Sequence, residues 1–170
     1  MEFMELAAAR YSVRKFTGQA VEEEKLNTIL EAGRIAPTAR NFQPQRVYVL
    51  RTPEAVAKAE KLTSCMYGAS TALLVCCDMD RVWKNPLRPG YSTWEVDTSI
   101  VTTHMMLAAW ELGIGSVWVG HFCDTEVAEA FNLPENIRPV AFLPLGYAAV
   151  VPNEAQHGGY RPKEETVEYL

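Results

Sequence analysis

The chain has 170 residues, 48% of them hydrophobic, and its formal net charge at pH 7 is −5. A chain of this size forms one domain and buries about 70% of the surface that it exposes when unfolded, so its core needs neither disulfide nor metal. No block of lysines and arginines stands out, which disfavours nucleic-acid binding. No segment offers about 20 uncharged apolar residues, so we expect no membrane span.

The four cysteines show neither the spacing of a zinc site nor a disulfide framework. Cys76 and Cys77 fall in the apolar run Ala72–Cys77, so we expect both to be buried. Side chains of neighbouring strand residues point to opposite faces, so these two thiols are not expected to pair. The chain begins with acidic residues and lacks the apolar segment typical of a signal peptide. We therefore expect a cytoplasmic protein with reduced thiols.

Helices are predicted where apolar residues recur three and four apart, and strands where β-branched and aromatic residues run together. In the first half of the chain this predicts, in order, a helix from Phe3 to about Tyr11, a helix over Glu22–Gly33, a strand over Arg46–Leu50, a helix from Thr52-Pro53 to about Leu62, and a strand over Ala72–Cys77. Thr52 and Pro53 are typical of a helix start, because one offers a capping hydroxyl and the other tolerates the first helical position. The continuous apolar run Ala72–Cys77 indicates a strand covered on both faces.

In the second half the same patterns predict, in order, a loop over Arg81–Tyr91, a long helix over Ser92–Leu112 that Gly113 ends, a strand over Ser116–Val119, a helix capped by Asp124 and running through Phe131, a strand over Val140–Gly146, and a short helical tip near Glu164–Tyr169. The fold class is therefore α+β, with about four strands and helices on both faces of the sheet. We expect one domain over 1–170. Its tail, from about residue 152, has no core of its own, so it either frays or wraps a partner subunit.

The segment Arg10–Phe16 places three cations and a hydroxyl just past the first helix. If it is extended, Arg10, Ser12 and Arg14 share one face, since side chains alternate along a strand. Two guanidinium groups flanking a hydroxyl make a good cradle for a phosphate or another anion. The alternative is a solvated basic turn anchored by Phe16.

The connection Ala36–Gln45 joins a helix to a strand and is stiffened by two prolines. Asn41 and Gln43 present amides at alternate positions, and an amide offers both the donor and the acceptor that the edge of a heterocycle needs. The alternative is an ordinary polar connection between two elements.

The glycines of Gly113–Gly120 resemble a dinucleotide-binding signature, but they follow a helix and precede a strand. That signature must follow a strand and open a helix, so we reject a Rossmann interpretation. Gly120, at the end of the predicted strand, would let a flat ligand approach the backbone closely. The alternative is a simple strand terminus.

Four motifs in order give the chain a resemblance to the nitroreductase family of flavoproteins over nearly its whole length. They are an Arg-x-Ser-x-Arg/Lys-x-Phe opening (Arg10–Phe16), a Pro-Ser/Thr-x-x-Asn-x-Gln-Pro segment (Pro37–Pro44), a Leu-Gly-Ile/Leu-Gly helix end leading to a strand and a glycine (Leu112–Gly115, Gly120), and a closing Leu-Gly-Tyr (Leu145–Tyr147). The resemblance implies a three-layer α/β/α fold with a mostly antiparallel sheet, and a homodimer with FMN at the subunit interface. One departure is Gln45, where the family often has Trp.

The resemblance also implies roles for individual residues. Arg10 and Ser12 would hold the phosphate and ribityl end of FMN, with Tyr11 between them, and Arg14 would lie at the pyrimidine edge. From the other subunit would come Pro37, Thr38 and Asn41, with Gln43 as a weaker candidate. The backbone of Val119 and Gly120 would face the flavin ring near N5, and Arg161 would reach the phosphate from the tail.

The function implied is an oxidoreductase that passes electrons from NADH or NADPH through flavin N5 to a small organic acceptor, such as a nitroaromatic or a quinone, by a ping-pong mechanism. No metal and no protein nucleophile are expected, because the redox chemistry belongs to the cofactor. Two alternatives remain open: a related flavoenzyme that reduces an activated alkene or removes a halogen, and a non-catalytic flavin-binding protein. The sequence does not identify the electron acceptor or the roles of His121 and Cys123. It also does not decide whether the donor is NADH or NADPH, or whether the tail exchanges between subunits.

Overall fold

The computed structural model describes residues 2–150 and 159–170. Its centre is a four-stranded sheet in the order β1-β2-β4-β3, in which every neighbouring pair is antiparallel. The strands are β1 (Gln45–Leu50), β2 (Thr71–Asp78), β3 (Gly115–Ser116) and β4 (Ile137–Gly146). The predicted α+β class and antiparallel sheet are confirmed.

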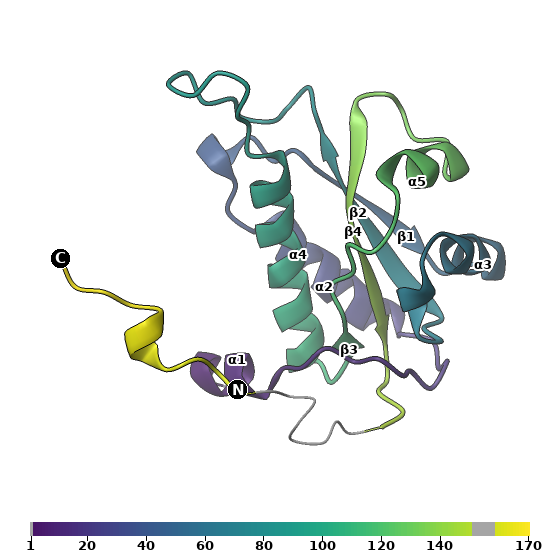
Figure 1. The fold of residues 1–170 in the computed structure, drawn as a ribbon. Helices are drawn as coiled ribbons and strands as arrows, with labels where there is room; N and C mark the ends of the chain where they lie inside the picture. The colour runs from purple at the N-terminus through teal and green to yellow at the C-terminus, as the bar shows by residue number, and fades with distance from the viewer. Residues whose placement is uncertain (1, 151–158) are drawn as a thin grey trace.

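Helices cover both faces of the sheet (Figure 1). On one side lie α2 (Glu23–Arg34) and α4 (Trp94–Glu111), and on the other α3 (Pro53–Leu62) and α5 (Asp124–Ala130), while α1 (Phe3–Ala9) lies beside the C-terminal end of α4. Short 3₁₀ turns occur at η1 (Ala39–Asn41), η2 (Ser64–Met66) and η3 (Lys163–Glu165). The expected three layers are confirmed.

The core is divided in two by the sheet, because alternate side chains of each strand point to opposite faces. Leu73 and Val75 of β2 pack with the cluster under α2 and α4, whereas Leu74 and Cys76 pack with the cluster under α3 and α5. Every residue of β2 is buried, as its continuous apolar run predicts. Both Cys76 and Cys77 are fully buried, which confirms their predicted burial.

The predicted helix at Thr52 is confirmed in detail, since its hydroxyl accepts a hydrogen bond from the backbone N–H of Ala55 at 3.2 Å. The long helix α4 stops before Gly113, whose φ of 74° is a conformation that glycine adopts without steric cost. The helix predicted over Glu22–Gly33 is α2, displaced by one residue at each end.

Three predicted boundaries are wrong. The first helix ends at Ala9 instead of near Tyr11, because Arg10 is already extended (φ −63°, ψ 131°). The N-cap residue of α5 is Cys123, whereas the predicted cap, Asp124, is the first residue of the helix. The last helical tip is the 3₁₀ turn Lys163–Glu165 instead of a turn over Glu164–Tyr169.

Two predicted strands also differ in extent. The strand expected over Ser116–Val119 pairs regularly only at Gly115 and Ser116, and Val119 makes an isolated bridge to Phe142. The strand expected from Val140 begins at Ile137 instead. The pairing of β2 with β4 shifts at a bulge where Val75 faces Ala141 and Cys76 faces Pro139. A bulge of this kind accommodates a proline that cannot donate to the ladder.

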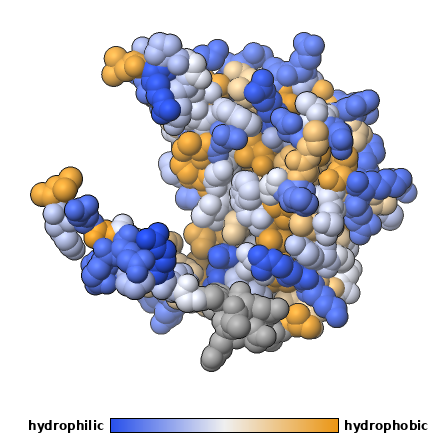
Figure 2. All heavy atoms as spheres, in the orientation of Figure 1, coloured by the Kyte–Doolittle hydropathy of each residue, from blue (hydrophilic) through white to orange (hydrophobic). Residues whose placement is uncertain are grey.

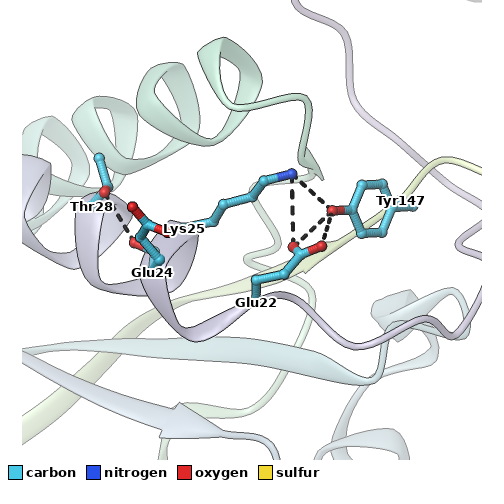
Figure 3. Close-up of polar contacts among 5 residues, drawn as sticks. All are labelled: Glu22, Glu24, Lys25, Thr28 and Tyr147. Carbon is cyan, nitrogen blue, oxygen red and sulfur yellow. Dashed lines mark hydrogen bonds and ion pairs between the residues drawn. The ribbon is translucent and has the colours of Figure 1, made fainter.

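A polar cluster ties the start of α2 to the end of β4 (Figure 3). The Tyr147 hydroxyl donates to the Glu22 carboxylate, 2.7 Å from each oxygen, and accepts a hydrogen bond from Lys25 Nζ at 2.8 Å. The carbonyl of Tyr147 in turn accepts from the N–H of Thr17 at 2.9 Å. The cluster therefore fixes the point where the segment after α1 crosses the sheet.

No helix within residues 2–150 and 159–170 is long and apolar enough to cross a bilayer. Within the same residues, no three His, Cys, Asp or Glu side chains are grouped as metal ligands.

Candidate functional site: two half-sites at opposite ends of α4

The basic segment after α1 is extended and lies along the outer edge of β3. Ser12 forms a parallel bridge with Ser116, and the N–H of Val13 donates to the Ser116 carbonyl at 3.0 Å. Gly115 makes this close approach possible, because a Cβ there would lie 2.6 Å from Cγ2 of Val13. The segment is therefore held by the backbone of the sheet edge instead of turning freely in solvent.

Side chains of this segment alternate as expected for extended backbone. Val13 is buried in the core and Tyr11 packs edge-on against Trp110, with ring centroids 4.9 Å apart. Arg10 is half-buried and Arg14 is exposed. Nη1 of Arg10 is buried and has no hydrogen-bond partner among the described residues. A buried guanidinium nitrogen without an acceptor is costly, so this atom marks a place where an anion would bind.

The second predicted segment, the connection that holds Pro37 and Asn41, is a strained loop at the other end of α4. Arg40, Asn41 and Gln43 all have positive φ, at 52°, 56° and 51°. Such conformations cost of order 1–3 kcal/mol each and persist only where the surroundings impose them, typically at functional sites. Pro37, Asn41 and Gln43 are exposed, so the loop presents its amides outward.

Hydrogen bonds to the side chains of Thr38 and Asp97 help to hold this loop in place. The Thr38 hydroxyl accepts from the N–H of Gln43 at 3.0 Å, closing the loop on itself. Asp97, which is only 2% exposed, accepts from the N–H of Ala39 at 2.9 Å and from the Thr93 hydroxyl at 2.6 Å. An acidic residue on the buried face of a helix indicates a carboxylate that accepts hydrogen bonds inside the protein, as Asp97 does.

One copy of the chain does not bring the two predicted segments together. Asp97 holds the loop near the N-terminal end of α4, and Trp110 packs against Tyr11 near its C-terminal end. With a rise of 1.5 Å per residue, these two anchors are about 20 Å apart along the helix axis. Within one copy, Arg10–Arg14 and residues 37–43, which we call the two half-sites, therefore lie near opposite ends of α4.

The outer face of α4, which runs between the two half-sites, carries an apolar groove of about 890 Å³. The apolar and aromatic residues of the groove come from α1 and α4: Phe3, Leu6, Val96, Ile100, His104, Leu107 and Ala108. The inner face of α4 is also apolar, with Val101, Met105 and Ala109 fully buried. A helix that is apolar on both sides is typical of one buried on both sides. Figure 2 shows this flank recessed between the protruding loop over residues 81–91, which precedes α4, and the tail.

The remaining predicted residues belong to other stretches of the chain. Val119 is buried, and its N–H and carbonyl both pair with Phe142, at 2.9 and 3.0 Å. Gly120 is exposed, and a Cβ there would lie 2.8 Å from the Trp118 ring. A side chain at position 120 would therefore require the Trp118 ring to shift.

Arg161 lies in a tail that extends past α1 and away from the sheet (Figure 1). Every residue over 159–170 is exposed, and Arg161 pairs with Glu165 at 3.1 Å. The part of the predicted tail over 152–158 lies outside the described residues.

The family assignment follows from sequence and fold together. The sequence model of the nitroreductase family matches residues 7–67 and 58–147, which together span most of the chain. This chain belongs to the nitroreductase family. A solved structure of a nitroreductase family protein from Clostridium difficile is 44% identical to it, with a TM-score of 0.93 and coverage of 99% of this chain and 98% of the other.

Two curated relatives of this nitroreductase-family chain carry functional names. A protein of Methanothermobacter thermautotrophicus, provisionally named NADH dehydrogenase/NAD(P)H nitroreductase, is 32% identical over 161 residues, covering 89% of this chain and 80% of the relative. An FMN reductase [NAD(P)H] of Bacillus subtilis is 28% identical, covering 81% of this chain and 62% of the relative. The predicted family membership is confirmed.

In this nitroreductase-family chain, Cys123 and His121 are exposed and line a cavity of about 510 Å³ beside the C-terminal end of α3. The Cys123 thiol lies 3.1 Å from the Thr125 hydroxyl, and this hydrogen bond lowers the pKa of the thiol below its ordinary value. The geometry thus gives Cys123 an accessible and comparatively acidic thiol.

Proposed function

We propose that this chain is an FMN-dependent oxidoreductase that takes electrons from NADH or NADPH and delivers them to a small organic acceptor. Membership of the nitroreductase family and the name of the Bacillus subtilis relative, an FMN reductase, support the cofactor and the donor. The observation that carries the proposal for this chain is the buried, unpartnered Nη1 of Arg10. It fits a site for the FMN phosphate.

Arg10 and Ser12 would bind the phosphate and ribityl end of FMN from the extended segment. Both residues are half-buried, so an anion there would be partly shielded from water and its hydrogen bonds strengthened. A guanidinium group binds a phosphate through parallel N–H donors, and a hydroxyl donates a further bond. Tyr11, which lies between them, fixes the backbone by packing on Trp110.

Arg14 would lie at the pyrimidine edge of the flavin, where negative charge develops on reduction. Its side chain is exposed, and no carboxylate among residues 2–150 and 159–170 forms an ion pair with it. A fixed, uncancelled positive charge at that edge favours the reduced cofactor.

We infer that two copies of the chain build each FMN site. The half-sites in one copy are separated by about 20 Å along α4, and the groove on α4 lies between them. Pairing two copies through this groove would bury the second apolar side of α4. It would also bring Pro37, Thr38 and Asn41 of one copy, with Gln43, toward Arg10–Arg14 of the other.

Exposed Gly120 would allow the flavin ring to approach the backbone beside Val119, and Arg161 would add a cation from the tail. When bound, FMN supplies the redox chemistry, accepting hydride from the nicotinamide and passing electrons to the acceptor in turn. The residues of this chain bind the cofactor, orient it and set the charge around it. None of them needs to act as a nucleophile.

The test is FMN affinity in Arg10→Ala, with Arg34→Ala as a matched control. Arg34 is an exposed arginine that pairs with Glu31 on the surface of α2, far from the extended segment in sequence. Losing a charge-assisted phosphate contact of about 1.5–3 kcal/mol would weaken FMN binding about 10- to 100-fold. Titration of the apoprotein by flavin fluorescence measures this, followed by anaerobic reduction with NADH. Unchanged affinity in Arg10→Ala, or a flavin that neither nicotinamide reduces, would refute the proposal.

A further inference from the structure

A short hairpin projects from the molecule just before the start of α4 (Figure 1). Lys84 and Ser92 pair across it as an antiparallel bridge. Nearer its tip, the N–H of Tyr91 donates a hydrogen bond to the Arg88 carbonyl at 3.1 Å. Residues 84–92, which we call the basic hairpin, therefore have a defined backbone instead of that of a free loop.

The charge of the basic hairpin is of one sign. Lys84 and Arg88 are exposed cations, Arg81 comes just before them, and no Asp or Glu occurs over residues 81–93. Within the part of the chain that the structure describes, none of these three cations forms an ion pair. The chain as a whole carries a net charge of −5. The hairpin is therefore a local positive region on an acidic protein, and such a region attracts anions.

The guanidinium of Arg88 is oriented by an aromatic ring. It lies over the ring of Tyr91, 4.7 Å from the centroid. Stacking restrains the side chain but uses none of its N–H donors and does not cancel its charge, as a carboxylate would. Arg88 therefore keeps a full set of donors for a bidentate contact with an anion such as a phosphate.

The base of the hairpin is joined to the loop of the half-site at residues 37–43. One buried carboxylate, that of Asp97, accepts from the Ala39 N–H of this loop and from the hydroxyl of Thr93. The N–H of Thr93 in turn donates to the Trp83 carbonyl at 3.1 Å, across the base of the hairpin. Asp97 therefore fixes the hairpin relative to that half-site.

A hollow of about 380 Å³ is lined jointly by the two segments. Its lining residues are Asn41, Phe42, Asp80 and Arg81. Asp80 and Arg81 contribute opposite charges to the hollow. The positive charge that no carboxylate offsets therefore lies further along the hairpin, at Lys84 and Arg88.

We propose that Lys84 and Arg88 bind the phosphates of the nicotinamide dinucleotide that reduces the flavin. This inference rests on the proposed function, in which residues 37–43 of one copy approach the FMN held by the other. The nicotinamide ring must reach that flavin, whereas the phosphates, which carry the negative charge of the donor, extend away from it. A cationic hairpin fixed beside residues 37–43 suits those phosphates, with Arg88 as a planar fork and Lys84 as a point charge.

The experiment measures anaerobic reduction of the FMN-loaded protein by stopped flow, in wild type and in the double variant Lys84→Gln/Arg88→Gln. Both side chains are exposed, so the substitutions leave the core unchanged. The donor concentration that gives half the limiting rate reports binding, and the limiting rate reports hydride transfer. We expect that concentration to rise about tenfold with NADH or NADPH, as for two exposed charge-assisted contacts. The limiting rate should stay at the wild-type value.

The matched control is Lys61→Gln, which removes one positive charge elsewhere. Lys61 is an exposed lysine in the last turn of α3, on the opposite side of the sheet from α4 (Figure 1). We expect this variant to keep both the binding and the limiting rate of wild type. The difference between wild type and the double variant should also shrink as salt is added, because exposed charges are screened.

A donor without phosphates makes the test specific. N-benzyl-dihydronicotinamide has the same hydride-donating ring but no phosphate, so we expect it to reduce wild type and the double variant equally well. Equal weakening of NADH and NADPH in the double variant would assign the two cations to the pyrophosphate. A larger weakening of NADPH would assign them to its 2′-phosphate.

Two results would overturn the inference. One is wild-type binding of both dinucleotides by the double variant, and the other is an equal loss with the phosphate-free donor. Either result leaves the proposed function standing, because the wild-type flavin is still reduced by a nicotinamide. A wild-type protein whose FMN neither NADH nor NADPH reduces would instead refute the proposed function itself.

Discussion

Replacement of Asp97 by alanine tests whether a buried carboxylate holds the strained loop of the second half-site. Asp97 accepts hydrogen bonds from the Ala39 N–H and the Thr93 hydroxyl, at 2.9 and 2.6 Å, and is only 2% exposed. Each charge-assisted bond contributes about 1.5–3 kcal/mol. The cost of burying the carboxylate offsets part of that. We therefore expect Asp97→Ala to destabilise the fold by about 3 kcal/mol.

For a chain of this size that loss lowers the midpoint of thermal unfolding by about 6–12 °C. Urea unfolding should be measured at one fixed protein concentration, because assembly would shift the apparent stability. Asp97→Asn keeps one acceptor oxygen but loses the charge, so we expect about half of the effect. Glu54→Gln, an exposed acid in the first turn of α3, is the control and should cost less than about 1 kcal/mol.

Released from Asp97, the loop at Ala39 should also lose its fixed conformation, so FMN affinity should fall together with stability. An Asp97→Ala protein within about 0.5 kcal/mol of wild type, the range of ordinary surface changes, would refute the role assigned to this carboxylate.

Three further predictions concern other parts of the molecule. Ile100→Asp, in the groove on α4, should halve the particle mass seen by light scattering and weaken FMN binding, and a dimer of unchanged affinity would contradict the proposed pairing. A hydrogen bond from Tyr147 lowers the pKa of Glu22 in the folded protein. The stability that this bond contributes is therefore present above the pKa of about 4.3 that Glu has in the unfolded chain, and it is lost as the pH falls through the lower pKa of the folded state. The stability difference between wild type and Tyr147→Phe should therefore shrink on acidification, as urea titrations at several pH values would show. Burial raises the pKa of Cys76 to about 12, whereas Cys123 is exposed and its pKa is lowered. Iodoacetamide should therefore label Cys123 before Cys76, as mass spectrometry of the peptides would show. Labelling of Cys76 before Cys123 would contradict this prediction.

The layers of the fold were predictable because their signals are local. Ala72–Cys77 is apolar without interruption, and a short run of this kind is typical of a strand covered on both faces. The helix starting at Pro53 is set by a capping threonine, whose bond to Ala55 appears as expected.

What the sequence predicted wrongly depends on partners distant in the chain. Residues 117–119 have the composition of a strand, yet regular pairing ends at Ser116. As a result β3, the last strand of the sheet, is only two residues long. The strand predicted from Val140 begins at Ile137, because a bulge opposite Cys76 lets it run through Pro139.

For the candidate site, the sequence predicts a list of residues but not how they are arranged in space. The family motifs pointed to Arg10, Ser12, Arg14 and the loop at Asn41, yet no local signal says that α4 separates them by about 20 Å within one copy.

The bridge between Ser12 and Ser116 also has a consequence for solubility. Without residues 12–16, the unpaired backbone of β3 would be an open sheet edge, and open edges recruit strands from other chains. The same short stretch that is proposed to bind FMN therefore also shields the sheet. Deleting it should cause aggregation as well as loss of FMN binding.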